Sequence, residues 1–332
     1  RVIFHVDANS AFLSWTAAYR VKVLGETEDL REVPSVVAGD KESRHSIILA
    51  KSGPAKKYGI QTGEPLFQAL EKCPDLKIVA PDYPLYVEAS RHFVAMLRQF
   101  SPNVEQYSID EAWVDMTGTE RLWGAPRLAA EKMRLKIWEE LGFTVNIGIS
   151  NNKYLAKMAS DFKKPNLVHT LYQTEIKEKM WPLPVADLFG CGKASAETLQ
   201  KLGINTIGDL ANTNPDILKP HLKSHGYVLW QYANGIDDSV VEPIQAAVKG
   251  VGNSHTLSKD ATNKEEACKV LLTLADSVSS RLRKSGKYAS MVSVEIKYSD
   301  FRQASHQCSL KDPANTASAI YETACTLFDE LW

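Results

Sequence analysis

The stretch Tyr107-Ser108-Ile109-Asp110-Glu111-Ala112-Trp113 places two adjacent carboxylates between two short runs that have strand character. These runs, 103–108 and 112–116, predict a β-hairpin with both acids at its turn. A third carboxylate, Asp7, follows the apolar run that opens the chain. If that first strand lies beside the hairpin, three hard oxygen donors converge, and such a cluster suits Mg²⁺. Two ions about 3.5–4 Å apart would clamp the attacking and leaving oxygens of a phosphoryl or nucleotidyl transfer.

Each of these acids also has an ordinary structural explanation. An Asp-Glu pair at a turn is commonly a solvated polar feature of the turn itself. An aspartate that closes an apolar strand commonly caps the helix that follows. The metal-site hypothesis therefore depends on whether the fold brings the acids together.

The order of the predicted elements favours an α+β domain of the split-βαβ type. A small subdomain, residues 10–76, follows the first strand, and without it the order is β-α-β-β-α-β, with helices on one face of the sheet. The segments are 1–8, 84–100, 103–116, 126–141 and 144–149. Strands 1 and 3 are neighbours at the centre of that sheet, so the end of the first strand should lie beside the hairpin acids.

A helix over 150–161 leads to a second pattern that is typical of phosphate binding. Leu188-Phe189-Gly190-Cys191-Gly192-Lys193 is followed by a helix that Gly203 closes, which predicts a helix-hairpin-helix. Backbone N–H groups at the start of such a helix can hold one phosphate without reading base sequence. A plain turn between two helices remains the alternative.

The C-terminal part predicts a separate small domain. After a polar linker that contains Pro243, the order is β-α-β-β-α, and we expect that C-terminal residues are missing, because the chain stops where a last strand is due. The chain also opens on Arg1, which suggests a trimmed start. The predicted elements are a strand over 250–257, a helix over 264–284, strands over 288–298 and 303–310, and a helix over 313–331.

Composition is that of an ordinary globular protein with more than one domain: 332 residues, of which 44% are hydrophobic and 24% charged. No apolar run approaches the ~20 residues of a membrane span. Five widely spread cysteines without a C-x-x-C pair favour a reducing cytosol over a disulfide framework.

His221 and His225 have the spacing for one metal but no third ligand nearby, which favours a solvated helix face over a zinc site.

Net charge is −1, yet the charge is unevenly distributed along the chain. Residues 150–203 carry 8 basic and 5 acidic side chains, and residues 244–311 carry 11 and 6. Two basic segments of this kind could line a groove for nucleic-acid phosphates. Local excesses on solvated faces are the alternative.

With these motifs in this order, the chain resembles the Y-family translesion DNA polymerases, and most nearly their bacterial polymerase IV and UmuC-like groups. The resemblance rests on Asp7 after an apolar strand, the Ser-Ile-Asp-Glu-Ala block 108–112, Gly148-Ile149-Ser150-x-Asn152-Lys153, Lys164-Pro165-Asn166 and the Gly190-x-Gly192 hairpin, which occur in that family's order. It runs across the whole chain.

The resemblance implies five regions and an activity. They are a palm (1–9 and 77–165), fingers (10–76), a thumb with the helix-hairpin-helix (166–235), a linker (236–249) and a little finger (250–332). The implied activity is low-fidelity, template-directed DNA synthesis past damaged bases. A dNTP and primer-template DNA would be the substrates, and two Mg²⁺ ions, for which Mn²⁺ can substitute, the cofactors.

The resemblance also implies roles for single residues. Asp7, Asp110 and Glu111 match the catalytic metal ligands, with the Ala8 carbonyl as an additional one. Nucleotide-binding positions are Phe12 against the ribose 2′-OH, Ser10, and Lys56 and Lys164 on the triphosphate. DNA contacts are expected from Gly190, Gly192, Lys193, Arg281, Arg283, Lys284, Lys287 and Arg302. A sliding clamp is a further expected partner; we expect no membrane contact, a monomer, and a cytoplasmic, nucleoid-associated location.

The chain departs from the family pattern at Gly53, where many members have a tyrosine, and at Ala8-Asn9-Ser10, which replaces a more aromatic run and puts the Ser10 contact in question. Lys56, where members often have an arginine, also loses the bidentate fork on phosphate. We therefore expect looser nucleotide binding with the chemistry retained. A catalytically weak DNA-binding relative and a palm-fold nucleotidyl cyclase remain alternatives, and a primed template with dNTPs and Mg²⁺ would separate the three.

Overall fold

The computed structural model describes residues 1–40, 46–244 and 247–332, which form two compact units. Unit 1 is Arg1–Gln245 and unit 2 is Ala246–Trp332. No helix among the described residues is long and apolar enough to cross a bilayer.

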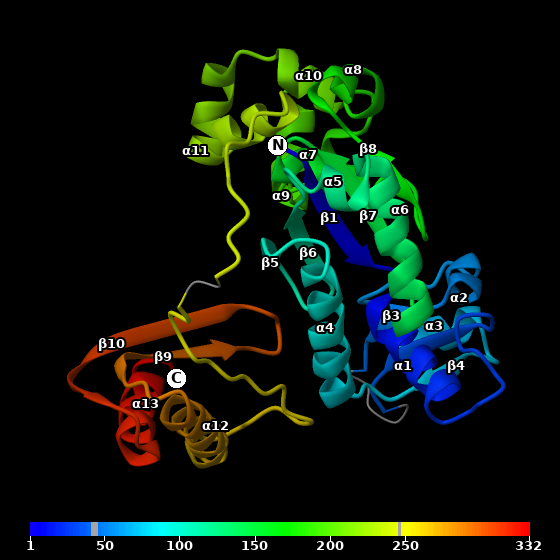
Figure 1. The fold of residues 1–332 in the computed structure, drawn as a ribbon. Helices are drawn as coiled ribbons and strands as arrows, with labels where there is room; N and C mark the ends of the chain where they lie inside the picture. The colour runs from blue at the N-terminus through cyan, green and yellow to red at the C-terminus, as the bar shows by residue number, and fades with distance from the viewer. Residues whose placement is uncertain (41–45, 245–246) are drawn as a thin grey trace. The chain divides into compact units, whose positions relative to one another are not determined.

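Unit 1 is built on a five-stranded sheet with the order β5-β6-β1-β7-β8 (Figure 1). The central strand β1 is antiparallel to both β6 and β7, and β8 adds a parallel edge strand beside β7. The bounds are β1 Ile3–Ala8, β5 Val104–Gln106, β6 Glu111–Asp115, β7 Val145–Ser150 and β8 Val168–Thr170. The first four strands have the predicted split-βαβ order, and the predicted adjacency of the first strand and the hairpin is confirmed.

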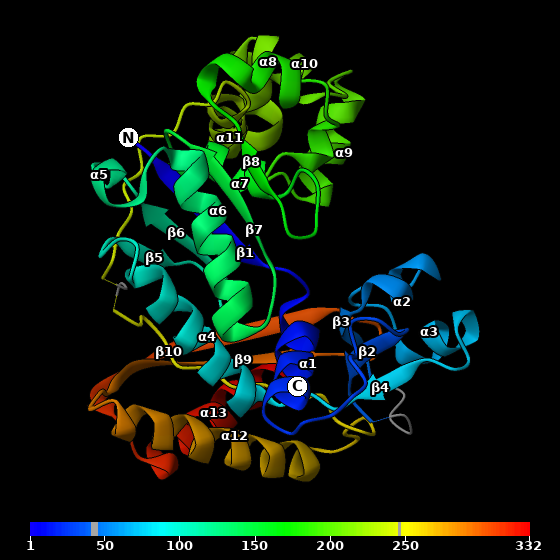
Figure 2. The same cartoon turned by 45° about the vertical axis from the view of Figure 1, so that its right-hand side comes forward.

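Helices cover both faces of this sheet, whereas the sequence predicted helices on one face. The helices α4 (Tyr83–Arg98) and α6 (Pro126–Lys136) pack on one face (Figure 2), where Phe4 and Val6 of β1 join their apolar core. Helix α7 (Lys153–Ser160) packs on the other face, against β1 and β7. Because side chains alternate along a strand, the residues of β1 between the apolar ones, among them Asp7, face α7.

The segment after β1 contains α1 (Ala11–Lys22), α2 (Gly53–Lys57), α3 (Leu66–Lys72) and a three-stranded sheet of order β3-β2-β4. The buried residues of α1 belong to the core of the large sheet, whereas α2, α3 and the small sheet share a core of their own. The strands are β2 Ser35–Ala38, β3 Ile48–Lys51 and β4 Lys77–Val79. The strand β4 falls in the range predicted for the palm, but it pairs in parallel with β2 and so belongs to this smaller sheet.

A helical region with its own apolar core follows β8. Its α-helices are α8 Ile176–Lys179, α9 Lys193–Lys201, α10 Ile207–Asn212 and α11 Pro215–Ala233. The backbone of α11 is not helical at Lys223, between His221 and His225. The break removes the regular spacing on which a shared metal would depend. The remaining elements of unit 1 are α5 Glu120–Trp123, η1 Ile137–Leu141, η2 Gln173–Glu175 and η3 Val185–Asp187.

Unit 2 consists of α12 (Lys264–Lys284), β9 (Ala289–Lys297), β10 (Gln303–Ala314) and α13 (Ala317–Leu331). The two helices share a core with inward residues of the two-stranded sheet, including Val292 and Val294. The strand predicted over 250–257 is wrong: these residues form no ladder with β9 or β10. A strand requires a partner for its backbone hydrogen bonds, and sequence pattern alone does not supply one.

Candidate active site

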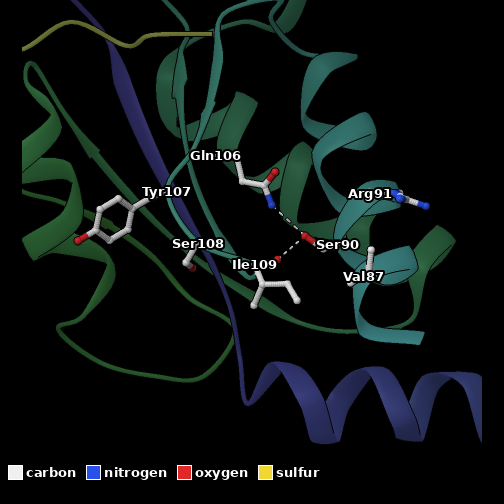
Figure 3. A pocket seen from close by; sticks show the side chains of 7 residues that line it. All are labelled: Val87, Ser90, Arg91, Gln106, Tyr107, Ser108 and Ile109. Carbon is white, nitrogen blue, oxygen red and sulfur yellow. Dashed lines mark hydrogen bonds between the residues drawn. The ribbon is translucent and has the colours of Figure 1, made fainter. Parts of the chain in front are cut away.

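The hairpin between β5 and β6 is fixed by its backbone and by a serine from α4. The N–H groups of Tyr107 and Ser108 both donate to the Glu111 carbonyl, at 3.0 and 3.2 Å. The Ser90 hydroxyl donates to the Ile109 carbonyl at 2.5 Å and accepts from Gln106 Nε2 at 3.0 Å (Figure 3). Residues of α4 and of the turn line a pocket of about 350 Å³ between them. The turn therefore has a defined conformation before any ligand binds.

The strand register brings Asp7 and Glu111 together. The two residues are direct cross-strand partners on β1 and β6, and the N–H of Ala8 donates to the Asp110 carbonyl at 3.0 Å. The Asp110 side chain is instead bound within the turn, where its Oδ1 accepts a 2.7 Å hydrogen bond from the Ser108 hydroxyl.

A glycine lets α7 lie unusually close to the sheet beneath these acids. A Cβ on Gly148 of β7 would lie 2.0 Å from the Ala156 carbonyl oxygen and 2.5 Å from the Ser160 nitrogen. Only a residue without a side chain permits that approach. The approach places the buried Lys157 of α7 against the carboxylates of the neighbouring strands.

Lys157 contacts three carboxylates at once. Its Nζ lies 2.9 Å from Glu111 Oε2, 3.1 Å from Asp161 Oδ2 and 3.6 Å from Asp7 Oδ2. Its side chain is 7% exposed. A buried ammonium is retained only where such partners offset its desolvation.

Lys164 forms a second bridge over the same carboxylates. Its Nζ lies 2.9 Å from Asp7 Oδ1 and 2.9 Å from Asp161 Oδ1. The loop that carries it is tied to the sheet: the Asn166 N–H donates to Asn9 Oδ1 at 2.9 Å, and Asn146 Nδ2 donates to the Lys163 carbonyl at 2.7 Å. Asn9 and Asn146 thus determine where the Lys-Pro-Asn block lies.

A buried histidine supports Glu111 from the other side. His5 Nε2 lies 3.1 Å from Glu111 Oε2, and His5 Nδ1 is 2.8 Å from the Ser160 hydroxyl. Burial lowers the pKa of His5. Burial alone would raise the pKa of Glu111, but the contacts with His5 and Lys157 outweigh it and lower that pKa to about 2.

The pKa of Asp7 is shifted in the opposite direction from that of Glu111. Burial raises the pKa of Asp7 even though Lys164 and Lys157 favour its charged form. Burial disfavours the ammonium forms of both lysines, yet the neighbouring carboxylates raise the pKa of each above its ordinary value. The site is thus a compact set of alternating charges.

The predicted convergence of three carboxylates is not formed in the described residues. No group of three or more His, Cys, Asp or Glu side chains lies in a metal-binding arrangement in this part of the chain. The Asp110 side chain bonds to Ser108, while lysines neutralise Asp7 and Glu111. Like charges gather only when a cation offsets their repulsion. Asp7 and Glu111 nevertheless lie opposite each other on neighbouring strands, and paired carboxylates are donors that a hard divalent cation prefers.

The predicted nucleotide-binding residues lie on different elements. Phe12 on α1 stacks on Tyr86, with ring centroids 4.4 Å apart and 8° between planes. Ser10 precedes that helix in a left-handed conformation, with φ of 48°. Lys56 is exposed on α2, and Gly53 begins that helix. Of the predicted triphosphate-binding lysines, only Lys164 contacts one of the three acids in the structure.

The predicted DNA-binding residues form three groups. Gly190, Gly192 and Lys193 lie exposed at and before the start of α9. Four exposed cations of unit 2 follow one another at the end of α12 and just beyond it: Arg281, Arg283, Lys284 and Lys287. Arg302 lies apart from them, after the far end of β9, where it pairs with Asp300. A nine-residue strand is about 30 Å long, so the structure does not group Arg302 with the others.

Three site residues escaped the sequence reasoning: His5, Lys157 and Asp161. Each had a signal in the sequence, since His5 shares a strand face with Asp7, and Lys157 and Asp161 have i, i+4 helical spacing. Nothing local in the sequence indicates that α7 packs beneath the acids.

Comparison with known proteins agrees with this architecture. Residues 6–161 match the impB/mucB/samB family, and residues 248–332 match its C-terminal domain. DNA polymerase IV of Clostridium acetobutylicum is 48% identical over 332 residues, which cover all of this chain and 83% of that protein. DNA polymerase IV of Clostridium kluyveri is 38% identical over 333 residues, covering 100% and 81%. A chimeric Y-family DNA polymerase of known structure has a TM-score of 0.86 at 23% identity, covering 100% of this chain and 94% of that one.

The fold is that of a Y-family DNA polymerase. Within that class, the chain belongs to the impB/mucB/samB family and is similar along its whole length to bacterial DNA polymerases IV. The predictions of family, fold class and DNA-directed DNA polymerase activity are thereby confirmed.

Proposed function

We propose that this chain performs translesion DNA synthesis at the site formed by Asp7, Asp110 and Glu111. The substrates are primer-template DNA and a dNTP, and the reaction transfers a dNMP to the primer 3′-OH with release of pyrophosphate. The observation that carries the proposal is the cross-strand pairing of Asp7 with Glu111 directly beside the Asp110 backbone.

Divalent metal dependence is general for this family, and we propose Mg²⁺ as the physiological ion. The three carboxylates, with the Ala8 carbonyl, would hold two ions, and Glu111 Oε1, which takes part in neither the Lys157 nor the His5 contact, is available for such a role. When bound, the ions would increase the acidity of the primer 3′-OH and offset charge on the triphosphate.

The remaining residues of the site would position the substrates. Lys164, 37% exposed, can leave Asp7 for a phosphate oxygen when a nucleotide binds. Lys56 offers a second cation from α2, and the Phe12 ring, fixed on Tyr86, would close the pocket on the sugar. The Gly190–Gly192 turn and the basic end of α12 would hold DNA phosphates.

Three further expectations rest on the family alone. We propose that the enzyme works as a monomer, that it binds a sliding clamp, and that it is associated with the nucleoid in the cytoplasm.

Primer extension by an Asp110→Asn variant tests the proposed site. We expect extension of a primed template with dNTPs and Mg²⁺ to fall at least about 10³-fold, whereas DNA binding measured by fluorescence anisotropy stays within twofold. Asp115→Asn is the matched control, because Asp115 lies at the other end of β6 and accepts a hydrogen bond from the Thr117 N–H. Extension by the Asp110 variant at the control rate would refute the assignment. A product formed without primer would indicate a cyclase, and binding without extension by the unmodified chain would indicate an inactive relative.

A further inference from the structure

Lys157 has no role in the function described so far, although it is the most buried cation beside the acids. It is 5% exposed as a residue, on a helix that Gly148 brings into contact with the sheet. Its partners belong to three elements: Asp7 on β1, Glu111 on β6, and Asp161 just after α7. Such a residue can influence how two proposed metal ligands are oriented without touching substrate.

The two lysines over these carboxylates differ in their freedom to move. The Lys164 side chain is 37% exposed and that of Lys157 is 7% exposed. An exposed lysine can exchange one anion for another at low cost, whereas a buried one would leave its carboxylates unpaired. Lys157 therefore stays in place when substrate binds, and Lys164 is the cation that can leave.

Lys157 and His5 contact the same oxygen of the Glu111 carboxylate. Lys157 Nζ and His5 Nε2 both lie beside the same oxygen, Oε2, at 2.9 and 3.1 Å. The other oxygen, Oε1, takes part in neither contact. Two fixed partners on one oxygen restrict rotation of the carboxylate and leave Oε1 to a ligand.

We propose that Lys157 is a positioning residue for the metal ions of the polymerase reaction, which holds the Glu111 and Asp7 carboxylates in the orientation that binds a divalent cation. The inference rests on the proposed function, since it assumes that these carboxylates are metal ligands. Loss of a residue that orients metal ligands typically costs 10- to 100-fold in metal affinity.

If Lys157 acts only through its charge, its replacement should raise the metal affinity and not lower it. An ammonium a few ångströms from a divalent cation repels it, so removing the charge alone would tighten ion binding. The direction of the change therefore separates positioning from simple repulsion.

Mn²⁺ binding to the full chain, without DNA or nucleotide, measures this direction. Free Mn²⁺ is followed by its electron paramagnetic resonance signal during titration of the unmodified chain and of Lys157→Met. We expect the variant to bind Mn²⁺ at least about tenfold more weakly. In primer extension, the half-saturating Mg²⁺ concentration should rise by a similar factor.

Lys153→Met is the matched control. Lys153 lies one turn earlier on α7, its side chain is 12% exposed, and it pairs with Glu105 at 2.7 Å, so the substitution removes a comparable ion pair away from the acids. We expect its Mn²⁺ affinity to stay within twofold of the unmodified chain. Equal losses in both variants would show that Lys157 only stabilises the fold and would overturn the inference.

The other outcomes are equally decisive. Mn²⁺ affinity that is unchanged or higher in Lys157→Met overturns the positioning role. Asp7→Asn reports on the proposed function separately: if the unmodified chain binds Mn²⁺ and Asp7→Asn binds it equally well, the metal site itself is misassigned. If Lys157→Met does not fold, Lys157→Gln, which retains a hydrogen-bond donor, is measured in its place with the same expected direction.

Discussion

At the residue scale, the carboxylate of Glu111 is the most perturbed acid of the site. Its contacts with His5 and Lys157 lower its pKa from 4.5 to about 2. In metal-free solution the charged form therefore stabilises the folded state fully above about pH 5. That contribution is lost as the pH falls through 4.5 toward 2, because the unfolded chain takes up the proton first. A difference of this size corresponds to about 3 kcal/mol.

Urea unfolding of the unmodified chain and of Glu111→Gln, in metal-free buffer between pH 6 and pH 3, checks this expectation. The difference in free energy of unfolding between the two should fall by about half by pH 3. A difference that stays constant over this range would show that the pKa of Glu111 is not lowered in the folded state.

The residue scale is also where the sequence was most informative. Asp7, Asp110 and Glu111 were predicted as site residues from their positions after and between strands, and the strand register places Asp7 opposite Glu111. The side chain of Asp110 could not be placed, because its bond to Ser108 depends on the conformation of the turn.

At the element scale, the site depends on how closely α7 approaches β7. The sequence predicted this helix and its length to within a few residues, but not the sheet face on which it packs. The helix residues Tyr154 to Ser160 are all buried, so no polar face marks the solvent side. The close contact between Gly148 and α7 joins residues of two elements, and the sequence alone does not indicate that they touch.

Gly148→Ala should therefore destabilise unit 1 by at least about 2 kcal/mol, since a Cβ 2.0 Å from the Ala156 carbonyl oxygen forces α7 away from the sheet. The same shift should weaken Mn²⁺ binding, because Lys157 moves with the helix. Gly53→Ala is the control: a Cβ there meets nothing within 4 Å, and alanine favours the helix that begins at this position. Chemical denaturation that shows equal stabilities for both variants would contradict this account of the packing.

At the scale of the whole molecule, the boundary between the two units lies within the segment 236–249 that was predicted as a linker, whereas the strand predicted after it is not formed. In unit 2 the bounds of α12 were predicted as the structure has them and those of β9 to within one residue, whereas β10 extends to Ala314 and α13 begins only at Ala317. The segment 250–257 has strand-like composition but forms no ladder in the described residues, and a composition pattern cannot supply the missing partner strand.

Charge distribution over the whole molecule gives the last prediction. The net charge is −1, so non-specific attraction to DNA must come from local groups such as the exposed cations at the end of α12. Each lysine that contacts a duplex phosphate adds about 0.9 to the slope of log affinity against log salt concentration. Lys284→Ala/Lys287→Ala should therefore reduce that slope by about 1.8 in anisotropy titrations with a primed duplex. Lys264→Ala/Lys269→Ala removes the same charge at the other end of α12, where these lysines pair with Asp329 and Glu265, and should change the slope by less than about 0.5. Equal reductions in both double variants would mean that DNA responds to overall charge and not to this end of the helix.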